Sequence, residues 1–333
     1  MVRISGVLQS VMRAIRVQKW GGPEVLQLEA KVPIPTPGDN EVLLKVHATG
    51  VNPVDTYIRS GNYARLPSLP YSPGSDAAGV VEAVGKDVKN FKKGDRAYSV
   101  RSVSGAYAEY ATSEALYTGH LAGKLSFSQG AALGVPYYTA YRALMQKGKA
   151  RPGETVLIHG ASGAVGMSAV QIARAQGLRV LGTAGTPEGL KLVKSLGASD
   201  VFNHREEGYI ANIVAATGGE GPNIILEMLS NANLQKDLEM IKFQGRIVVI
   251  GCRGAIEINP RLLMGKESQV LGIMLAASTP DEWREMHALL EAGGETGWVQ
   301  PHVGKEYKLE DVAKAHNDVI NCAGACGKLV LTV

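Results

Sequence analysis

Short apolar segments separated by turn residues make up the first third of the chain and predict a β-rich region. Alternating or β-branched residues are typical of strands, and Gly21-Gly22-Pro23 and residues 35–40 supply breaks between them. The segments with this pattern are residues 12–17, 25–34, 41–51, 77–84 and 105–110. We expect few long helices before residue 128.

From residue 128 onward, strand and helix patterns alternate, which predicts a doubly wound parallel sheet with right-handed crossovers. A helical stretch at residues 128–145, interrupted at Pro136, leads into this region. The expected strands are residues 155–158, 179–183, 200–203, 223–228, 246–251 and 269–275. The expected helices are residues 165–176, 190–196, 210–217 and 234–243.

The last part of the chain returns to the first region. Residues 281–292 and 309–320 have helical patterns, and residues 328–333 form a terminal strand that could pair with the N-terminal region. We therefore expect a discontinuous β-rich catalytic domain, residues 1–127 and 278–333, with an α/β domain of residues 128–277 inserted into it.

The stretch at residues 155–166, TVLIHGASGAVG, predicts a dinucleotide-binding turn. A buried-strand signal is followed by small residues and then by a helical pattern. Small residues let the backbone approach a pyrophosphate, and the N–H groups of the helix end favour its charge. Against the G-x-G-x-x-G template, Ala161 takes the first glycine position, and Gly163 and Gly166 take the other two. The alternative is a tight strand-to-helix turn without a ligand.

The second strand of the α/β region indicates which dinucleotide is preferred. NAD sites place a carboxylate at the end of this strand to bind the ribose hydroxyls. Here the strand ends in GTAGT, with Gly185 near its end and no carboxylate before Glu188. The third strand ends in Asn203-His204-Arg205, which offers cationic or hydrogen-bonding groups. The pattern favours NADP over NAD.

Composition limits the other classes of function. The 333 residues are 45% hydrophobic and 20% charged, which is typical of a globular protein. The net charge of +4 is too small to indicate nucleic-acid binding by itself. Three cysteines without zinc-ribbon or disulfide spacing suit a reducing compartment, so we expect a cytoplasmic protein. No apolar run is long enough for a membrane span, and the residues before the first strand are expected to be a disordered extension.

Ordered motifs along residues 12–333 resemble the medium-chain dehydrogenase/reductase superfamily, specifically the quinone oxidoreductases of the zeta-crystallin family. The motifs are GGPEVL at Gly21, GVNPVDTYIRSG at Gly50, PGSDAAGVV at Pro73, KKGDR at Lys92, HGASGAVG at His159, FNHRE at Phe202, EINPR at Glu257 and KESQVLG at Lys266. One departure is Ala164, where the family commonly has glycine. The resemblance implies a Rossmann domain inserted in a GroES-like catalytic domain.

Zinc ligands are missing at the positions where zinc-dependent members of this superfamily carry them. These positions read Asn52-Pro53, Gly74-Ser75-Asp76 and Val135-Pro136-Tyr137, without Cys or His. A tetrahedral Cys/His site cannot be built there, so we predict a zinc-free protein. Without a Lewis acid, a simple ketone is hard to reduce, whereas a quinone accepts hydride readily.

The resemblance also implies site residues. Asn52 and Tyr57 would be catalytic: Asn52 could bind a quinone oxygen, and Tyr57 could pack on the cofactor and orient or protonate the oxyanion. Tyr57 as an ordinary core or interface aromatic is the alternative. The residues expected to bind NADP are Tyr57, Ser162, Gly163, Ala164, Val165, Gly166, Gly185, His204, Asn233, Ile250, Gly251, Cys252, Arg253, Ile273, Met274 and Leu275.

The family resemblance implies NADPH-dependent reduction of quinones, with ortho-quinones favoured and semiquinone as the product. An alkenal or enone reductase is the alternative enzyme. Binding of AU-rich RNA or a lens role, in addition to catalysis, is an alternative of another class. The family expectation for assembly is a homo-oligomer, a tetramer. Cys322 and Cys326 are assigned no function.

Overall fold

The computed structural model describes residues 10–321, 324 and 326–333. The expected N-terminal extension and Cys322 lie outside the described residues. Contacts divide the chain into two compact units. The first unit comprises residues 1–134, 305–321 and 329–333, and the second comprises residues 135–304 and 322–328.

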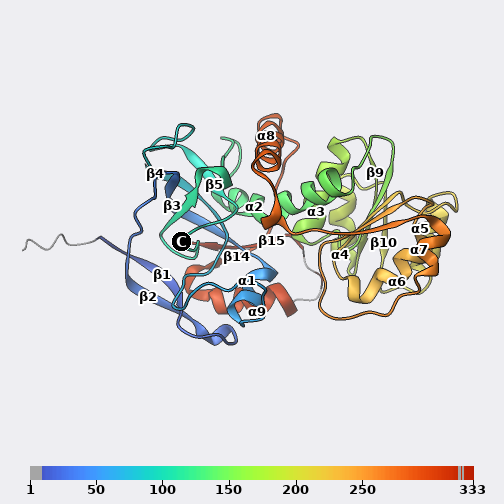
Figure 1. The fold of residues 1–333 in the computed structure, drawn as a ribbon, viewed down its shortest axis with the longest axis horizontal. Coiled ribbons are helices and arrows are strands. Elements are labelled where there is room, and N and C mark those ends of the chain that lie inside the picture. The colour runs from blue at the N-terminus through green and yellow to red at the C-terminus, as the bar shows by residue number, and fades with distance from the viewer. Residues whose placement is uncertain (1–9, 322–323, 325) are drawn as a thin grey trace, which may run out of the picture. The chain divides into compact units, whose positions relative to one another are not determined.

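The first unit is β-rich, as its alternating apolar segments predict (Figure 1). A hairpin of β1 and β2 accompanies a larger sheet with the order β14-β15-β3-β4-β5-β7, in which β6 also pairs with β3. The strands are β1 (Val11–Val17), β2 (Leu26–Pro33), β3 (Glu41–Val51), β4 (Asp76–Val84), β5 (Arg96–Ser99), β6 (Tyr110–Glu114), β7 (Thr118–His120), β14 (Val303–Lys308) and β15 (Lys328–Thr332). The helical elements are η1 (Pro23–Val25), α1 (Pro53–Arg59), η2 (Ala115–Tyr117), η5 (Leu309–Asp311) and α9 (Val312–Asn321).

The terminal strand pairs with the N-terminal region, as expected. β15 runs antiparallel to β3, with Leu329 opposite Val51 and Thr332 opposite Ala48. Tyr107, Val312 and Leu331 share one buried apolar cluster, so residues from distant parts of the sequence close the core of this unit.

Residues 105–110 continue the sheet only at their end, so this expectation is confirmed in part. Tyr110 begins β6 and pairs with Lys45 of β3, whereas residues 105–109 form no strand. Within them, Ala108 forms only an isolated bridge with Ala14. The backbone alternates between two different partners: Ala106 and Tyr107 bond residues 73–74, and Glu109 bonds Arg13. Alternating apolar residues alone do not distinguish such a path from a strand.

The second unit contains the predicted parallel sheet. Its strand order is β10-β9-β8-β11-β12-β13, which is the 3-2-1-4-5-6 order of a dinucleotide-binding sheet. The strands are β8 (Thr155–Ile158), β9 (Arg179–Ala184), β10 (Asp200–Asn203), β11 (Ile224–Glu227), β12 (Arg246–Val249) and β13 (Gln269–Gly272). The helical elements are α2 (Phe127–Tyr141), η3 (Arg142–Lys147), α3 (Ala164–Ala175), α4 (Pro187–Ser195), α5 (Tyr209–Ala216), α6 (Ser230–Met240), α7 (Arg261–Lys266), η4 (Leu275–Ala277) and α8 (Pro280–Thr296).

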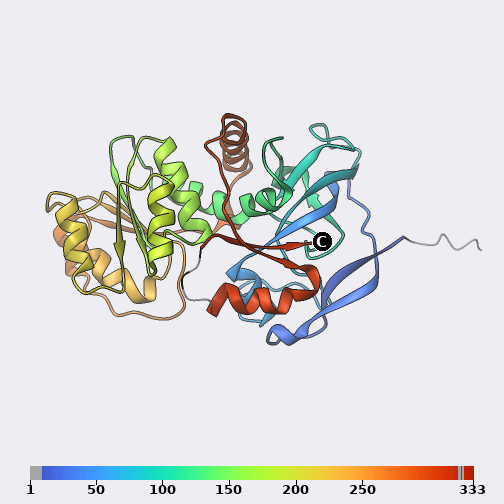
Figure 2. The same ribbon diagram turned by 180° about the vertical axis from the view of Figure 1, so that it is seen from behind.

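Helices cover both faces of this sheet (Figure 2). Leu181 of β9 faces a buried cluster that includes Ile213 of α5 and Leu238 of α6. The next residue, Gly182, faces the opposite side, where a Cβ atom would lie 2.6 Å from Val193 of α4. Because helices bury both faces of the sheet, its strands are apolar on both faces.

The boundaries of the two units differ from the expected ones. The helix α2 changes direction at Gly134, which has non-helical backbone angles, and the unit boundary follows it. Residues 278–304 belong to the second unit by contacts, whereas the sequence division joined them to the first. The reason is a set of polar contacts from α8: Glu282 accepts a hydrogen bond from Arg142 at 2.7 Å, and Glu285 accepts one from Tyr141 at 2.7 Å.

The length and hydropathy of the helices show whether any of them could cross a membrane. Among the residues that the structure describes, no helix is both long and apolar enough to cross a bilayer.

Candidate functional site

The glycine turn between β8 and α3 has the close packing that the dinucleotide template requires. A Cβ atom on Gly166 would lie 2.5 Å from the Gly160 carbonyl oxygen and 2.6 Å from the Ala161 Cα. Gly163 is the N-cap of α3, and no side chain caps the helix there. The first turn of a helix leaves N–H groups without helical partners, and these groups attract anions. The turn therefore fits a pyrophosphate, with Ala164 and Val165 as the first helical residues.

The ends of β9 and β10 meet where a 2′-phosphate is expected. A Cβ atom on Gly185 would lie 2.7 Å from His204 Nε2 and 2.9 Å from Arg205 Nε. The side chains of His204 and Arg205 therefore lie against the backbone of Gly185, while Glu188 is in the first turn of α4. Partial burial, then the neighbouring charge of Arg205, lowers the pKa of His204. This arrangement places the Arg205 guanidinium and the His204 ring beside a position that carries no carboxylate.

The loops after β11 and β12 are joined by backbone contacts. Ser230 N donates to the Gly251 carbonyl at 3.0 Å, and Ile250 N donates to the Glu227 carbonyl at 2.8 Å. A Cβ atom on Gly251 would lie 2.2 Å from the Met228 carbonyl oxygen, so this approach needs glycine. The structure thus brings together two of the segments predicted to bind the cofactor.

The remaining predicted residues of the second unit lie just beyond the strands rather than in them. β12 ends at Val249 and β13 at Gly272, so residues 250–253 and 273–275 are loop or 3-10 residues. Ile273 N bonds the Val249 carbonyl at 3.3 Å, which places the two segments side by side at the carboxyl edge of the sheet. Met274 is 46% exposed, and Leu275 begins η4.

Cys252 and Arg253 are exposed at this edge. The Cys252 thiol donates to the Gly254 carbonyl at 2.9 Å, and Arg253 N donates to Asn231 Oδ1 at 2.8 Å. A hydrogen bond with the Ser230 side chain is the main cause that lowers the pKa of Cys252.

A buried polar cluster beneath the glycine turn was missed by the sequence reasoning. His159 Nε2 lies 2.9 Å from Asp237 Oδ1 and 3.7 Å from Glu227 Oε2, and the side chains of the three residues are 0–3% exposed. Asn233, predicted to reach the cofactor, donates from Nδ2 to Glu227 Oε1 at 3.2 Å. The available signals were an acid ending the apolar strand IILE and an aspartate on the apolar face of the next helix.

In the first unit, Asn52 and Tyr57 lie at the start and in the middle of α1. Asn52 N donates to Asp55 Oδ2 at 2.8 Å in a capping box, and Pro53 is the first helical residue. The Asn52 side chain is buried and donates from Nδ2 to Asp76 Oδ2 at 2.8 Å. Asn52 therefore has structural partners of its own, while Tyr57 is half-buried.

A chain of buried polar groups holds α1 in place. Tyr107 Oη donates to Asp55 Oδ2 at 3.1 Å and lies 3.1 Å from His316 Nε2. Arg59 Nη1 lies 3.2 Å from His316 Nδ1, which therefore accepts the bond. Burial, then the Arg59 charge, lowers the pKa of His316 to about 3, so the imidazole is neutral. The helix that carries Tyr57 is thus fixed at both ends.

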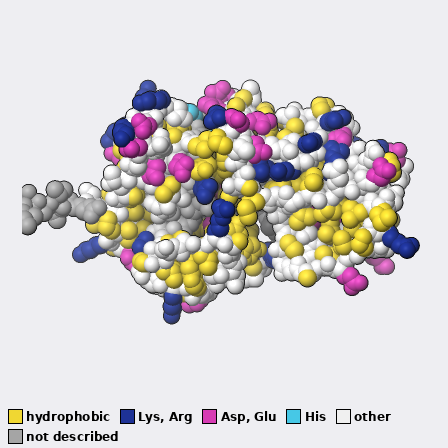
Figure 3. Space-filling view, viewed as in Figure 1, with side chains coloured by type: hydrophobic (Ala, Val, Ile, Leu, Met, Phe, Trp, Pro, Cys, Tyr) yellow, Lys and Arg dark blue, Asp and Glu magenta, His cyan; other side chains and the backbone are white. Residues whose placement is uncertain are grey.

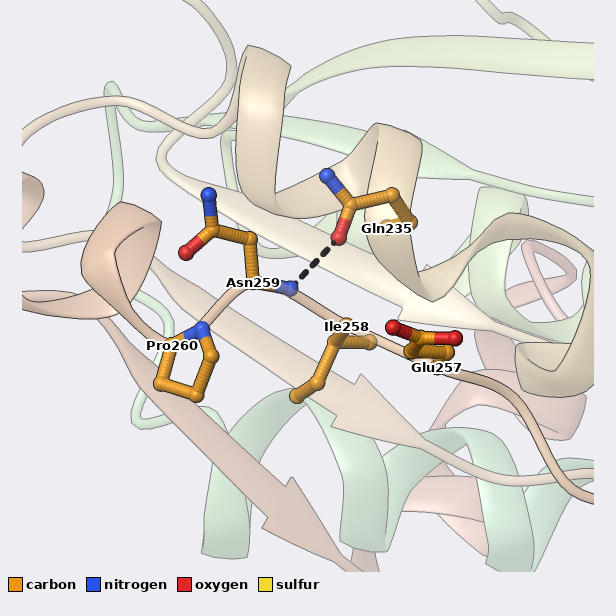
Figure 4. A pocket seen from close by; sticks show the side chains of 5 residues that line it. All are labelled: Gln235, Glu257, Ile258, Asn259 and Pro260. Atoms are coloured by element: carbon orange, nitrogen blue, oxygen red, sulfur yellow. Dashed lines mark hydrogen bonds between the residues drawn. The ribbon is translucent and has the colours of Figure 1, made fainter.

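A pocket beside α6 is lined by residues to which we assign no part in catalysis (Figure 4). It is lined by Gln235, Glu257, Ile258, Asn259 and Pro260, and Asn259 N donates to Gln235 Oε1 at 2.9 Å. Its only charged lining residue, Glu257, is exposed, so we assign it no catalytic role.

Comparisons with known proteins identify the relatives of this chain. A family model described as zinc-binding dehydrogenase matches residues 164–292, and one described as alcohol dehydrogenase GroES-like domain matches residues 38–132. The chain is 54% identical to proteins named quinone oxidoreductase from Rattus norvegicus and from Homo sapiens, over 97% of this chain and 98% of each relative. The solved structure of Escherichia coli quinone oxidoreductase complexed with NADPH has a TM-score of 0.86 and 32% identity, covering 96% of this chain and all of that one.

Proposed function

The chain belongs to the quinone oxidoreductase family of the medium-chain dehydrogenases/reductases, and we propose that it reduces quinones with NADPH. The observation that carries this proposal is the 54% identity over nearly the whole length to proteins named quinone oxidoreductase. The meeting of Gly185, His204 and Arg205 at the strand ends supports NADPH over NADH.

We assign some residues to cofactor binding and others to the reaction. Bound NADPH would supply the hydride. The α3 N-terminus and the residues around Gly163 would hold its pyrophosphate, and His204 and Arg205 its 2′-phosphate. Tyr57 would orient the quinone and protonate its developing oxyanion. Asn52 would contribute a hydrogen bond while remaining tied to Asp76.

A zinc-independent reaction is part of this proposal. None of the three ligand positions offers Cys or His, and Asp76, at the Gly-His-Glu position, is fully buried and bonded to Asn52. The pair cannot complete a tetrahedral Cys/His site.

A substrate panel tests the function. NADPH and NADH oxidation is followed with 1,2-naphthoquinone, a para-quinone and an unsaturated aldehyde, each with and without a chelator. We expect the ortho-quinone with NADPH to be turned over fastest and the chelator to have no effect. Faster turnover of the aldehyde would make the protein an enone reductase, and activity lost on chelation would contradict the zinc-free mechanism.

The number of electrons transferred per quinone is measured in the same reactions. Full reduction uses one NADPH and one proton per quinone to give hydroquinone, whereas semiquinone formation uses one NADPH per two quinones. Spin-resonance detection of a radical, with a ratio of two quinones per NADPH, is the expected result. A ratio of one without a radical would contradict semiquinone formation.

Self-association through the edge of the nucleotide sheet is a further part of the proposal. Among the described strands, β13 pairs only with β12, and an unpaired edge is a template for pairing. Hydrophobic side chains gather over this part of the unit (Figure 3). Phe243, Met264, Val270 and Met274 are 58%, 77%, 38% and 46% exposed. Light scattering should show a dimer or tetramer, and Val270→Lys should dissociate it; a monomeric wild type would contradict the proposal.

The cytoplasmic location stays a prediction.

RNA binding also stays a prediction, and the described residues add no observation in its favour. Binding of an AU-rich oligonucleotide, measured with and without NADPH, tests it. Competition by NADPH would indicate that RNA occupies the cofactor site.

A further inference from the structure

A chain of polar contacts runs beneath the glycine turn. Gly160 N donates to Thr183 Oγ1 at 3.1 Å, and this hydroxyl lies 3.4 Å from His159 Nδ1. On the other side of the ring, Nε2 lies 2.9 Å from Asp237 Oδ1. One neutral tautomer satisfies both contacts: Nδ1 accepts from the threonine hydroxyl, and Nε2–H donates to the carboxylate. Burial lowers the pKa of His159, which agrees with a neutral ring.

The two carboxyl groups at the end of this chain need a proton. Glu227 Oε2 and Asp237 Oδ2 are buried and have no hydrogen-bond partner among the described residues. A ring nitrogen of His159 and one carboxylate oxygen each of Glu227 and Asp237 lie within 4.8 Å of one another. Two buried carboxylates this close cannot both ionise without strong repulsion, and a shared proton gives an oxygen its missing donor. Burial raises the pKa of Glu227 and of Asp237, each to about 7.

Glu227 connects this pair to the loops at the carboxyl edge of the sheet. Its Oε1 accepts from Leu229 N and, at 3.2 Å, from Asn233 Nδ2. Its backbone carbonyl accepts from the N–H groups of Ile250 and Gly251. A change in the position of this side chain therefore reaches Asn233 and both loops that are proposed to hold the cofactor.

We propose that His159, Asp237 and Glu227 form a positioning cluster, in which one proton shared by the two carboxyl groups holds the β11–α6 loop in its cofactor-binding conformation. The last step rests on the proposed use of NADPH, whereas proton sharing does not. Loss of the shared proton as the pH rises through neutrality leaves two adjacent buried charges, displaces the Glu227 side chain and weakens cofactor binding.

Other groups near the cluster also titrate or carry charge. The charge of Lys236 of α6 interacts electrostatically with His159 and Asp237. Tyr209 of α5 interacts in the same way with both carboxylates. His204, after β10, is influenced by His159. Tyr209 has a raised pKa and stays neutral through this range. The 2′-phosphate of NADPH titrates near pH 6, so NADH, which lacks it, is the cleaner probe.

Asp237→Asn is the decisive variant because an asparagine can replace the shared proton. Its Oδ1 accepts from His159, and its Nδ2 donates to ionised Glu227. Glu227→Gln is the reciprocal variant, because the glutamine Nε2 can donate to ionised Asp237. Glu239→Gln is the matched control, since Glu239 is an exposed carboxylate on the same helix.

The first measurement is dissociation of NADH and of NADPH by fluorescence at pH 6.0 and pH 8.5. For the wild type and Glu239→Gln, the NADH Kd should rise about fivefold between these pH values, as expected for one lost hydrogen bond. For Asp237→Asn and Glu227→Gln the rise should be less than twofold. Equal pH dependence in all four proteins would overturn the proposal.

The second measurement uses the protein without cofactor. A carboxyl pKa raised on folding stabilises the fold below the unfolded pKa, and this contribution is lost as the pH rises through the folded pKa. The wild-type Tm should therefore fall between pH 6.0 and pH 8.5 by about 3–5 °C more than the Tm of Asp237→Asn. An equal fall would overturn proton sharing.

Two further outcomes separate the alternatives. If neither dinucleotide binds the wild type, the proposed function fails and with it the role in cofactor binding, while the Tm profile still decides proton sharing. One histidine and two carboxylates are also ligands for a divalent metal. About one equivalent of metal per chain by elemental analysis, with a Tm lowered by a chelator, would replace the proton by a cation and overturn the proposal.

Discussion

Replacing Gly166 by alanine should disturb the glycine turn more than any other single methyl group added to it. The added Cβ would lie 2.5 Å from the Gly160 carbonyl oxygen and 2.6 Å from the Ala161 Cα, both backbone atoms. Ordinary contacts are about 3.4 Å or longer, so the turn and α3 must separate by roughly 1 Å. Overpacking of this kind costs about 1–3 kcal/mol of unfolding free energy.

The same displacement should weaken cofactor binding. Hydrogen bonds from backbone N–H groups to a charged pyrophosphate contribute about 1.5–3 kcal/mol each, so losing one raises the NADPH Kd roughly ten- to hundredfold. The assays are calorimetric titration with NADPH and thermal unfolding without it. We expect Tm to fall by roughly 2–10 °C.

Gly265→Ala is the control for this prediction. Gly265 lies in α7 of the same unit, and an added Cβ would meet nothing within 4 Å. Alanine is the better helix former, so its Tm should be unchanged or slightly higher. Gly166→Ala with wild-type affinity and wild-type Tm would refute the packing argument.

Three further outcomes follow from the described contacts. Gly185→Asp should raise the KM for NADPH at least about tenfold while changing that for NADH much less, because the carboxylate repels the 2′-phosphate; equal changes would show that the effect is steric. Tyr57→Phe should lower kcat with 1,2-naphthoquinone about 10- to 100-fold if the hydroxyl delivers the proton, and an unchanged kcat would leave the ring only a packing role. The His316 imidazole, with its pKa lowered to about 3, stabilises the fold above pH 6.5 and loses this contribution as the pH falls; His316→Gln should therefore flatten the decline in Tm between pH 6.5 and pH 4, and an equally steep decline would contradict a neutral His316.

The parallel sheet could be predicted because its signals are local. Each strand is a short apolar run bounded by turn residues, and the glycine turn follows the first of them directly. The alternation of strands and helices predicts a parallel sheet, and the structure confirms it. Gly185 and His204 could be expected together for the same reason, since they end neighbouring parallel strands.

Other parts of the site depend on contacts that no local pattern encodes. Asp237 is one acid on an amphipathic helix, and its burial beside His159 and Glu227 depends on the packing of α6 against the sheet. The partner of Asn52, Asp76, is 24 residues away in the chain. Residues 105–109, which were expected to join the strand that begins at Tyr110, show the same limit, because an alternating pattern does not specify its partners.

The pairing of β15 with β3 has a consequence for the order in which the chain folds during synthesis. All six strands of the nucleotide sheet lie between residues 155 and 272, so they can assemble while later residues are still being added. Residues 48–51 of β3 must wait for residues 329–332, which are synthesised much later than the rest of the first sheet's N-terminal strands. Until then that edge is open to pairing with another chain. Chaperone dependence during translation should therefore concentrate on the N-terminal half, even though it is made first.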